Sequence, residues 1–505
     1  MLKLFGDGKP IHPMADAREA RKTLDAIPAG DPFKAIEELI HWFESVGAPE
    51  GFKPEHRAQL VQMIDEAAQV HLRKLQRDYL STPRLSKFQE NRLWSAIHGY
   101  WRQSALALAA CIDLSISGQK GVDRLENGLP LLAMRALRAL AAQVKWQYIR
   151  YGPCENSIWG IVARIFTLAE NRKFARTRAT VYPGVPGESS PEQEFLKVVM
   201  FPASSPNSLL PVEIELVDRL IAHFSASFSL TIEPQSDVAY WIDLAASQPP
   251  QRLGRPQQQV PTLRFFAAGK AMQELEQLIR VVKSTNALPS SVALGGVYEP
   301  EVVLDVLQHL SLYWSPTLPQ RKAPRHKVKS GLSVTHGFDG VLSALDPSEL
   351  DASGIESWIV ENVSAGGFGA GVPQIKGEWL GIGSLIGLRP DGGDNWVIGV
   401  IRRFSRGTPQ QGMVGIQTLA RSALPMEIKV RSGTGSDTGI GILLDPSDDG
   451  AEVHVLLRPG VLASGQNLEI ERSGKLFLLM PAGVAERGDD YEVIRCRQMI
   501  REVGE

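Results

Sequence analysis

The sequence predicts a multidomain α+β protein, with a mostly helical N-terminal half followed by two smaller segments of β-strands. The length of 505 residues is too large for a single ordinary core, because domains typically hold about 100–200 residues. Apolar residues recur at three- and four-residue steps up to about residue 315, and at two-residue steps beyond it. The proline-punctuated stretch Ser315–Pro324 separates the two patterns and indicates a linker.

Residues 1–314 are assigned to a mostly helical domain, with room for two subdomains. Helical periodicity is found in Ala35–Phe43, Arg57–Leu80, Leu85–Leu114, Leu129–Arg150, Ile158–Asn171, Pro211–Phe228, Ala267–Thr285 and Glu301–Tyr313. Pro211 and Pro300 suit the start of a helix, where a missing N–H costs nothing. Proline-rich breaks fall at Tyr182–Pro191, Phe201–Pro206 and Gln248–Pro261, and the stretches Val238–Leu244 and Thr262–Phe266 favour strands.

Residues 330–422 read as a small sandwich or barrel, because short strand-like runs alternate there with Gly, Pro, Asp and Asn clusters. The runs are Val341–Leu345, Ser357–Val360, Leu385–Arg389, Trp396–Phe404 and Gly412–Thr418. Residues 423–505 carry six further runs and either form a second small β-domain or complete the first. These runs are Met426–Arg431, Gly439–Leu444, Val453–Leu457, Leu468–Arg472, Leu476–Leu479 and Tyr491–Arg497, with a hairpin turn expected at Ser473–Gly474.

Composition excludes several classes of protein. Lys and Arg number 54 against 56 Asp and Glu, which leaves a net charge of −2 and excludes a globally basic nucleic-acid coat. The cysteines Cys111, Cys154 and Cys496 lie far apart, so we expect neither a zinc ribbon nor a disulfide framework. This usage suits a reducing cytosol, and the N-terminus shows no signal peptide. We therefore expect a cytoplasmic chain, without a membrane-spanning segment because no apolar run reaches 18 residues.

Motifs for the common catalytic chemistries are missing from the sequence. There is no phosphate-binding P-loop, no HExxH zinc motif and no GxSxG nucleophile elbow. The ten histidines are dispersed, and His98 beside Trp94 and Trp101 is interpreted as structural. We therefore expect no enzyme activity, no catalytic residue, no metal and no cofactor.

The most basic stretch of the chain is Arg321–Lys329, in which five of nine residues are Lys or Arg. No acidic residue occurs between Ser315 and Phe338, so this stretch attracts anions in a chain of near-zero net charge. Arg321 and Arg325 are four residues apart, and Pro324 favours an extended or turned backbone over a helix. An arginine fork can bind phosphate or the O6/N7 edge of guanine in a bidentate manner. Taken alone, the stretch could equally be a solvated basic linker.

A second cluster of polar and small residues spans positions 361–371 (ENVSAGGFGAG). Asn362 and Ser364 are two residues apart at the end of a strand-like run, so their side chains should share one face. The glycines, Gly366 and Gly367 among them, would let a ligand approach the backbone. Taken alone, this cluster could be only a turn between strands.

The two clusters together resemble a known family. Arg321-x-x-x-Arg325 followed by Asn362-x-Ser364-x-x-Gly367 is similar to the two-part signature of the PilZ domain, a six-stranded antiparallel β-barrel whose usual ligand is cyclic di-GMP. The runs Trp396–Phe404 and Gly412–Gln417 resemble the late strands of such barrels. The resemblance covers about residues 320–422.

The resemblance implies a role for each matching residue. Arg321 and Arg325 would clamp phosphate and guanine, with Lys322 adding charge. Asn362 and Ser364 would hydrogen-bond a guanine, and Gly366 and Gly367 would provide the turn that leaves room for it. Two departures are visible. Position 362 is Asn where Asp is frequent, and the 37-residue gap between Arg325 and Asn362 is long, with the excess assigned to a loop over Leu345–Ser357.

The sequence therefore predicts a cytosolic cyclic di-GMP receptor with a helical domain at 1–314, a basic linker at 315–329, a PilZ-like barrel at 330–422 and a small β-domain at 423–505. Ligand would order the linker and favour one domain arrangement, which an unidentified protein partner of the helical half would sense. The output pathway, whether motility, pili, exopolysaccharide or secretion, is left open. The alternative is a scaffold or chaperone-like interaction protein, with an apolar surface near Trp94, Trp101, Trp146 and Trp159 and a barrel that does not bind nucleotide. Nucleic-acid binding by the basic stretch is disfavoured, because it lacks stacking aromatics.

Overall fold

The structure, a computed structural model, divides into two compact units that are described separately. It describes residues 12–47, 52–82, 85–116, 122–254, 260–317, 324–346, 354–432, 435–446, 451–463 and 465–501. The first unit takes Met1–Arg150, Cys154–Pro206 and Leu210–Pro319. The second takes Gln320–Glu505 together with the short segments Tyr151–Pro153 and Asn207–Leu209.

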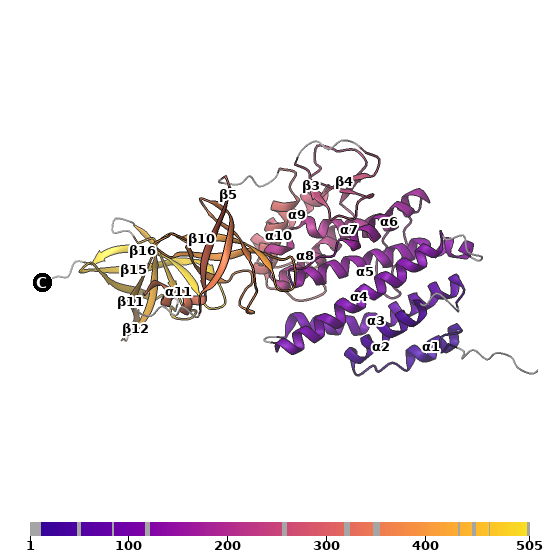
Figure 1. The fold of residues 1–505 in the computed structure, drawn as a ribbon, viewed down its shortest axis with the longest axis horizontal. Coiled ribbons are helices and arrows are strands. Elements are labelled where there is room, and N and C mark those ends of the chain that lie inside the picture. The colour runs from indigo at the N-terminus through magenta and orange to yellow at the C-terminus, as the bar shows by residue number, and fades with distance from the viewer. Residues whose placement is uncertain are drawn as a thin grey trace, which may run out of the picture. The chain divides into compact units, whose positions relative to one another are not determined.

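The first unit is mainly a bundle of α-helices (Figure 1). The helices are α1 (Ala17–Asp25), α2 (Pro32–Gly47), α3 (Pro54–Ser81), α4 (Lys87–Leu114), α5 (Leu129–Ile149), α6 (Ser157–Asn171), α7 (Pro191–Ala203), α8 (Pro211–Phe224), α9 (Ala271–Thr285) and α10 (Pro300–Trp314). Ser86 caps α4 in a capping box with Gln89, and the predicted first-turn prolines Pro211 and Pro300 begin α8 and α10. Helix α5 packs against α4, α6, α7 and α8 and is buried along most of its length, so it forms the centre of the bundle.

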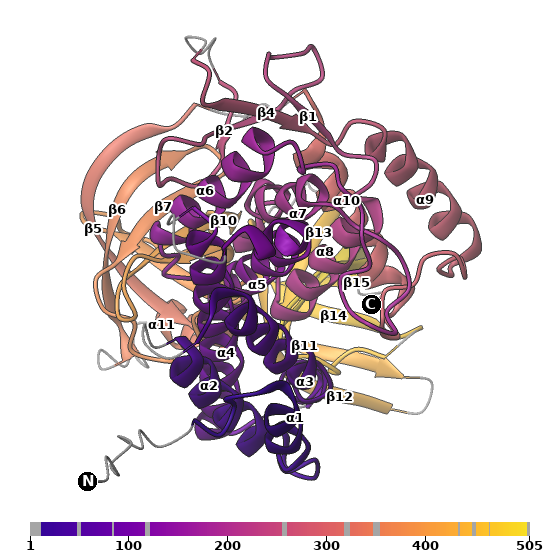
Figure 2. The ribbon, with the colours of Figure 1, turned by 90° about the vertical axis from the view of Figure 1, so that its right-hand side faces the viewer.

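A small antiparallel sheet completes this unit in the order β1-β4-β2-β3. Its strands are β1 (Ser229–Thr231), β2 (Tyr240–Asp243), β3 (Gln251–Arg252) and β4 (Leu263–Ala267), and they lie together at one edge of the helices (Figure 2). The two strands predicted in this half correspond to β2 and β4. Helices α1 and α7 were not predicted. Helix α1 is polar and buries only Ala20 among its residues, while α7 has a proline at its start and Pro202 near its end, which hides its periodicity.

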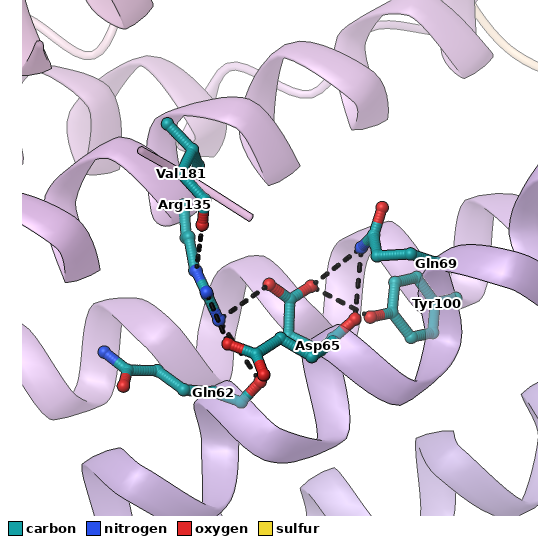
Figure 3. Close-up of polar contacts among 7 residues, drawn as sticks. Gln62, Asp65, Gln69, Tyr100, Arg135 and Val181 are labelled. Carbon is teal, nitrogen blue, oxygen red and sulfur yellow. Dashed lines mark hydrogen bonds and ion pairs between the residues drawn. The ribbon is translucent and has the colours of Figure 1, made fainter. Parts of the chain in front are cut away.

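The buried Arg135 of α5 contacts helix α3 and the loop that contains Val181, at the centre of the bundle. Arg135 is 2% exposed and lies 3.7 Å from the carboxylate of Asp65, itself 1% exposed. Its Nε donates to the Val181 carbonyl at 2.9 Å and its Nη2 to Glu66 at 2.6 Å. Tyr100 of α4 donates to the other Asp65 oxygen at 3.0 Å, so three helices and the loop meet at one charged cluster (Figure 3).

We expect Arg135→Met to destabilise the helical unit by about 3–5 kcal/mol, because it leaves the Asp65 carboxylate buried without its counter-charge. Arg164→Met, which removes a half-exposed ion pair with Asp113, should cost about 1 kcal/mol or less. Urea unfolding followed by tryptophan fluorescence, to which buried Trp146 of this unit contributes, measures both. Equal losses for the two variants would contradict a central role for Arg135.

A second buried cluster joins α7 to α5. The Glu194 carboxylate, 1% exposed, lies 2.9 Å from both Arg138 of α5 and Lys197 of its own helix. Burial alone would raise the pKa of Glu194, but Lys197 and Arg138 outweigh it and lower the pKa from the ordinary 4.5 to about 2.

Because the folded pKa lies below the unfolded one, this stabilisation is present above pH 4.5 and is lost as pH falls toward 2. We expect Glu194→Gln to reduce stability at neutral pH and to flatten the acid limb of the stability profile. Urea midpoints between about pH 3 and pH 6 test this. Glu192→Gln, on the same helix but in a more exposed pair with Arg176, serves as the control and should keep the acid limb.

The second unit contains two closed six-stranded antiparallel barrels (Figure 1). The first has the order β10-β7-β6-β5-β8-β9. Its strands are β5 (His326–His336), β6 (Glu356–Ser364), β7 (Gly367–Val372), β8 (Leu385–Pro390), β9 (Val397–Arg406) and β10 (Gly412–Ala420). Its core gathers inward-facing residues such as Trp358, Ala370, Phe404 and Val414. The six-stranded barrel that the sequence predicts is confirmed.

Three local predictions in the first barrel are corrected. Val341–Leu345 was expected to be a strand but lies in helix α11 (Gly337–Leu345), which buries Phe338, Val341 and Ala344 at three-residue steps. Strand β5 begins at His326, inside the stretch 315–329 that was read as a linker. Strand β7 was missed because its sequence, GFGAGV, resembles a loop. Most of the expected insertion Leu345–Ser357 lies outside the described residues.

The second barrel has the order β11-β12-β13-β16-β15-β14, so the C-terminal segment closes on itself instead of completing the first barrel. Its strands are β11 (Ala423–Ser432), β12 (Gly435–Leu444), β13 (Glu452–Leu457), β14 (Asn467–Arg472), β15 (Lys475–Arg487) and β16 (Glu492–Arg501). The predicted hairpin turn is confirmed: Ser473 and Gly474 both have positive φ, and Arg472 pairs with Lys475. One apolar cluster, which includes Val341, Ile398, Ile442 and Tyr491, is shared by the two barrels.

Candidate functional site

Pairing of β5 with β6 brings the two predicted motif halves together. His326 lies opposite Val363 and Lys327 opposite Asn362. Because the strands are antiparallel, Arg325, which directly precedes β5, lies at the Ser364 end of β6. Arg325 is exposed. Arg321 and Lys322 lie outside the described residues, so the structure gives no position for the first half of the arginine motif.

The Asn362 and Ser364 side chains lie close to glycines of β7. A Cβ at Gly369 would lie 2.5 Å from the Nδ2 atom of Asn362, so the glycine leaves room for the amide. The Ser364 hydroxyl donates to the Gly367 carbonyl at 3.3 Å. A Cβ at Gly367 would lie 1.9 Å from the carbonyl oxygen of Ile416 in β10, whereas Gly366 has nothing within 4 Å. Gly367 is therefore required by the barrel backbone itself.

A row of cross-strand neighbours extends from Asn362 around the outer face of the barrel. Asn362 pairs with Lys327 on one side and with Gly369 on the other, Gly369 pairs with Gly415, and Gly415 pairs with Arg403. Residues directly opposite one another share a face. The row faces outward, because the neighbouring residues Ala370 and Val414 belong to the core. It places a cation at each end, an amide next to one of them, and two glycines as the floor.

The glycine floor continues along β7. Gly367, Gly369 and Gly371 alternate along the strand and so share the outer face. Their partners on β10 are Gln417, Gly415 and Met413. We name this surface the glycine floor: Gly367, Gly369 and Gly371 of β7 with Gly415 of β10. Gly367 and Gly369 are buried, and the Asn362 amide lies over Gly369, so a ligand meets this floor together with the Asn362 side chain.

Three arginines beside the glycine floor were not assigned a role from the sequence. Arg402 Nε donates to Gln417 at 2.8 Å, Arg403 ends the cross-strand row, and Arg421 Nη2 donates to the Ala365 carbonyl at 3.0 Å. Arg402 and Arg403 are adjacent, so strand alternation would send one of them inward. A register shift opposite Gly415 and Ile416 breaks that alternation, and both remain at least partly exposed. The sequence shows the adjacent pair Arg402-Arg403, but it does not show the register shift that lets both side chains reach the surface.

The side chains on this face are of types that can bind phosphate and hydrogen-bond a base edge. Arginine and lysine bind phosphate oxygens, and the Asn and Ser side chains offer both donors and acceptors to a base edge. In the part of the chain that the structure describes, no three His, Cys, Asp or Glu side chains come together as a potential metal site. Across the same described residues, every helix is too short or too polar to span a lipid bilayer.

We expect Gly367→Ala to destabilise the first barrel by about 3 kcal/mol, because the new methyl would overlap the Ile416 carbonyl. The neighbouring Gly366→Ala meets open space and should change stability by no more than about 0.5 kcal/mol. Hydrogen exchange of the β7 and β10 amides distinguishes the two variants. Undisturbed exchange in Gly367→Ala would show that the strands tolerate a side chain there.

Comparison with known families adds evidence from another part of the chain. Residues 18–235 match the protein-family model described as "Cyclic-di-GMP receptor FimW, N-terminal domain". The matched residues run from α1 past β1 and make up less than half of the chain. No curated protein matches the sequence. The match does not include the first barrel, so the N-terminal half is similar to a cyclic di-GMP receptor family independently of the barrel motif.

Proposed function

We propose that the chain is a cyclic di-GMP receptor that binds the dinucleotide on the outer face of the first barrel. The observation that supports the proposal is the pairing of β5 with β6, in which Lys327 lies opposite Asn362 and His326 opposite Val363. The similarity of residues 18–235 to a cyclic di-GMP receptor family supports the same ligand from a different part of the chain. A receptor of this kind is a binding protein and needs neither a catalytic residue nor a cofactor.

In this proposal each group meets a part of the ligand that suits its chemistry. Arg321 and Arg325, with Lys322, bind phosphate and the guanine O6/N7 edge. Asn362 and Ser364 hydrogen-bond a guanine, and Gly366 and Gly367 form the turn beside it. A base can then lie over the glycine floor, with Lys327 and Arg403 at the two ends of the row that crosses it.

The effect of the ligand on the rest of the chain follows from where the basic stretch lies in the sequence. Residues 315–325 connect α10 to β5, so a ligand that fixes this stretch restricts the connection between the helices and the barrel. We propose that the helical half presents the result to a protein partner in the cytoplasm. Ligand can shift the domain arrangement only by its differential affinity for the two states.

The alternative, an interaction protein with an apolar tryptophan groove, finds less support. Trp101, Trp146 and Trp159 are 8%, 0% and 2% exposed, so they belong to the core of the helical unit. Because these tryptophan side chains are buried, they do not form the apolar surface that an interaction protein would need there.

Calorimetric titration of the full chain with cyclic di-GMP tests the proposal. We expect micromolar or tighter binding, about −8 kcal/mol or better. The Arg321→Ala/Arg325→Ala double variant and the Asn362→Ala variant should lose most of this affinity, because each removes direct ligand contacts. GTP should not compete.

Arg495→Ala, which removes an exposed arginine from the second barrel, is the matched control and should bind as the wild type does. Absence of heat and of competition at high ligand concentration would leave the first barrel as an architectural module only. Undiminished binding by the double variant would refute the assigned site while keeping the ligand.

A further inference from the structure

We propose that the second barrel is part of the nucleotide site, because its Glu486 holds Arg402 in position to contact the ligand. This inference rests on the proposed function and assigns a role to the C-terminal domain. Glu486 lies on β15, and Arg402 on β9 of the first barrel. In this assignment Arg402 touches a phosphate of the ligand, and Glu486 is a positioning residue that acts through Arg402.

The contacts of Arg402 fix its guanidinium from two sides. Its Nε donates to Gln417 Oε1 at 2.8 Å. Its Nη1 donates to Glu486 Oε1 at 3.0 Å, and its Nη2 donates to Glu486 Oε2, so the pair is bidentate. A guanidinium has five N–H groups, and these contacts use three of them. Arg402 is 39% exposed, so it remains accessible from solvent.

The position of Gln417 places this guanidinium at the edge of the glycine floor. Gln417 pairs with Gly367, and Gly367 pairs with Ser364. Two strand spacings, about 10 Å in all, therefore separate Gln417 from Ser364. His326 and Lys327, the described part of the basic stretch in β5, lie beside β6, on the far side of the glycine floor from Arg402. Arg402 thus offers a cation opposite the arginine motif, where the second phosphate of a cyclic dinucleotide can be met.

Packing and hydrogen bonds between the two barrels position the strand that carries Glu486. The two barrels share an apolar cluster that includes Val341, Ile398 and Ile442. The Tyr491 hydroxyl donates to the Gly383 carbonyl at 3.1 Å, and the Phe338 amide donates to Asp490 at 2.7 Å. Glu486 lies near the end of the strand that leads to Asp490 and Tyr491, beside a register shift in its pairing with β16, and its carboxylate contacts Arg402 across the two barrels. A fixed carboxylate removes rotamer freedom from Arg402 before the ligand arrives.

A second arginine, Arg421, links the turn between Ser364 and Gly367 to an acidic residue next to the second barrel. Arg421 holds the Ala365 carbonyl, in the turn between Ser364 and Gly367. The backbone amides of Arg421 and Ser422 both donate to Asp445 at 2.9 Å, just after β12 of the second barrel. Acidic side chains of the second barrel therefore hold both elements that border the glycine floor, which is the arrangement expected if this barrel preorganises the site.

Titration of full-length variants with cyclic di-GMP tests the inference. We expect Glu486→Ala to bind at least about tenfold more weakly than the wild type, because Arg402 is no longer held. Glu492→Ala is the matched control, since it breaks an Arg–Glu pair of the same barrel, with Arg487 at 2.8 Å, that does not reach Arg402. It should bind within about twofold of the wild type. If Glu486→Ala does not fold, Glu486→Gln gives the same comparison with a smaller change.

A charge swap separates positioning from a purely structural role. The double variant Arg402→Glu/Glu486→Arg restores the ion pair between the barrels, so its melting temperature should return toward that of the wild type. Its affinity should stay low, because the ligand now meets a carboxylate. Recovery of affinity together with stability, or undiminished binding by Glu486→Ala, would overturn the inference alone. A wild-type chain that does not bind would overturn the proposed function as well, and this inference with it.

Discussion

Closure of the first barrel depends on the absence of a side chain at Gly367. There β7 passes so close to β10 that a Cβ would lie 1.9 Å from the Ile416 carbonyl. The same strand has glycine at alternate positions, so its outer face carries no side chains. One requirement of the backbone therefore closes the barrel and leaves β7 without side chains of its own on its outer face. The polar groups of β5, β6 and β9 are arranged around that surface because closure fixes their register.

The helical unit depends on a different constraint, a buried charge that must be satisfied. Arg135 is almost fully enclosed at the centre of α5, where it forms an ion pair with Asp65 of α3 and donates to the Val181 carbonyl (Figure 3). It also donates to Glu66 of α3. An apolar side chain there could pack as well, but it would not select one arrangement of these segments. The unit that matches the receptor family is thus organised by polar contacts in its interior, while its tryptophans supply apolar volume.

The sequence predicted the long helices and most strands, because their periodicity extends over enough residues to be distinctive. The prediction from the sequence was wrong or missing where a segment is short, or where glycines take the positions at which alternating apolar residues would indicate a strand. Val341–Leu345 fits a strand or a helical turn equally well, and only the buried spacing of α11 decides. The motif residues of the proposed site follow from the sequence and stay a prediction, whereas Arg402 does not follow from it, since its contact with Glu486 joins residues 84 positions apart and depends on a bulge. Contacts between residues so far apart in the sequence become visible only in the folded structure.

Anion recognition in this chain is local, because a net charge of −2 provides no general attraction for a nucleotide. Cations must therefore be concentrated and oriented on one face. In the proposed site, Lys327 of β5 supplies a cation on one side, and the arginine pair of β9 supplies cations on the other side. Loosely held arginines would lose conformational freedom on binding, and a carboxylate from the second barrel reduces that loss. Under the proposed function, a nearly neutral chain gains selectivity for a compact dianion through geometry, and two tandem barrels provide more of that geometry than one.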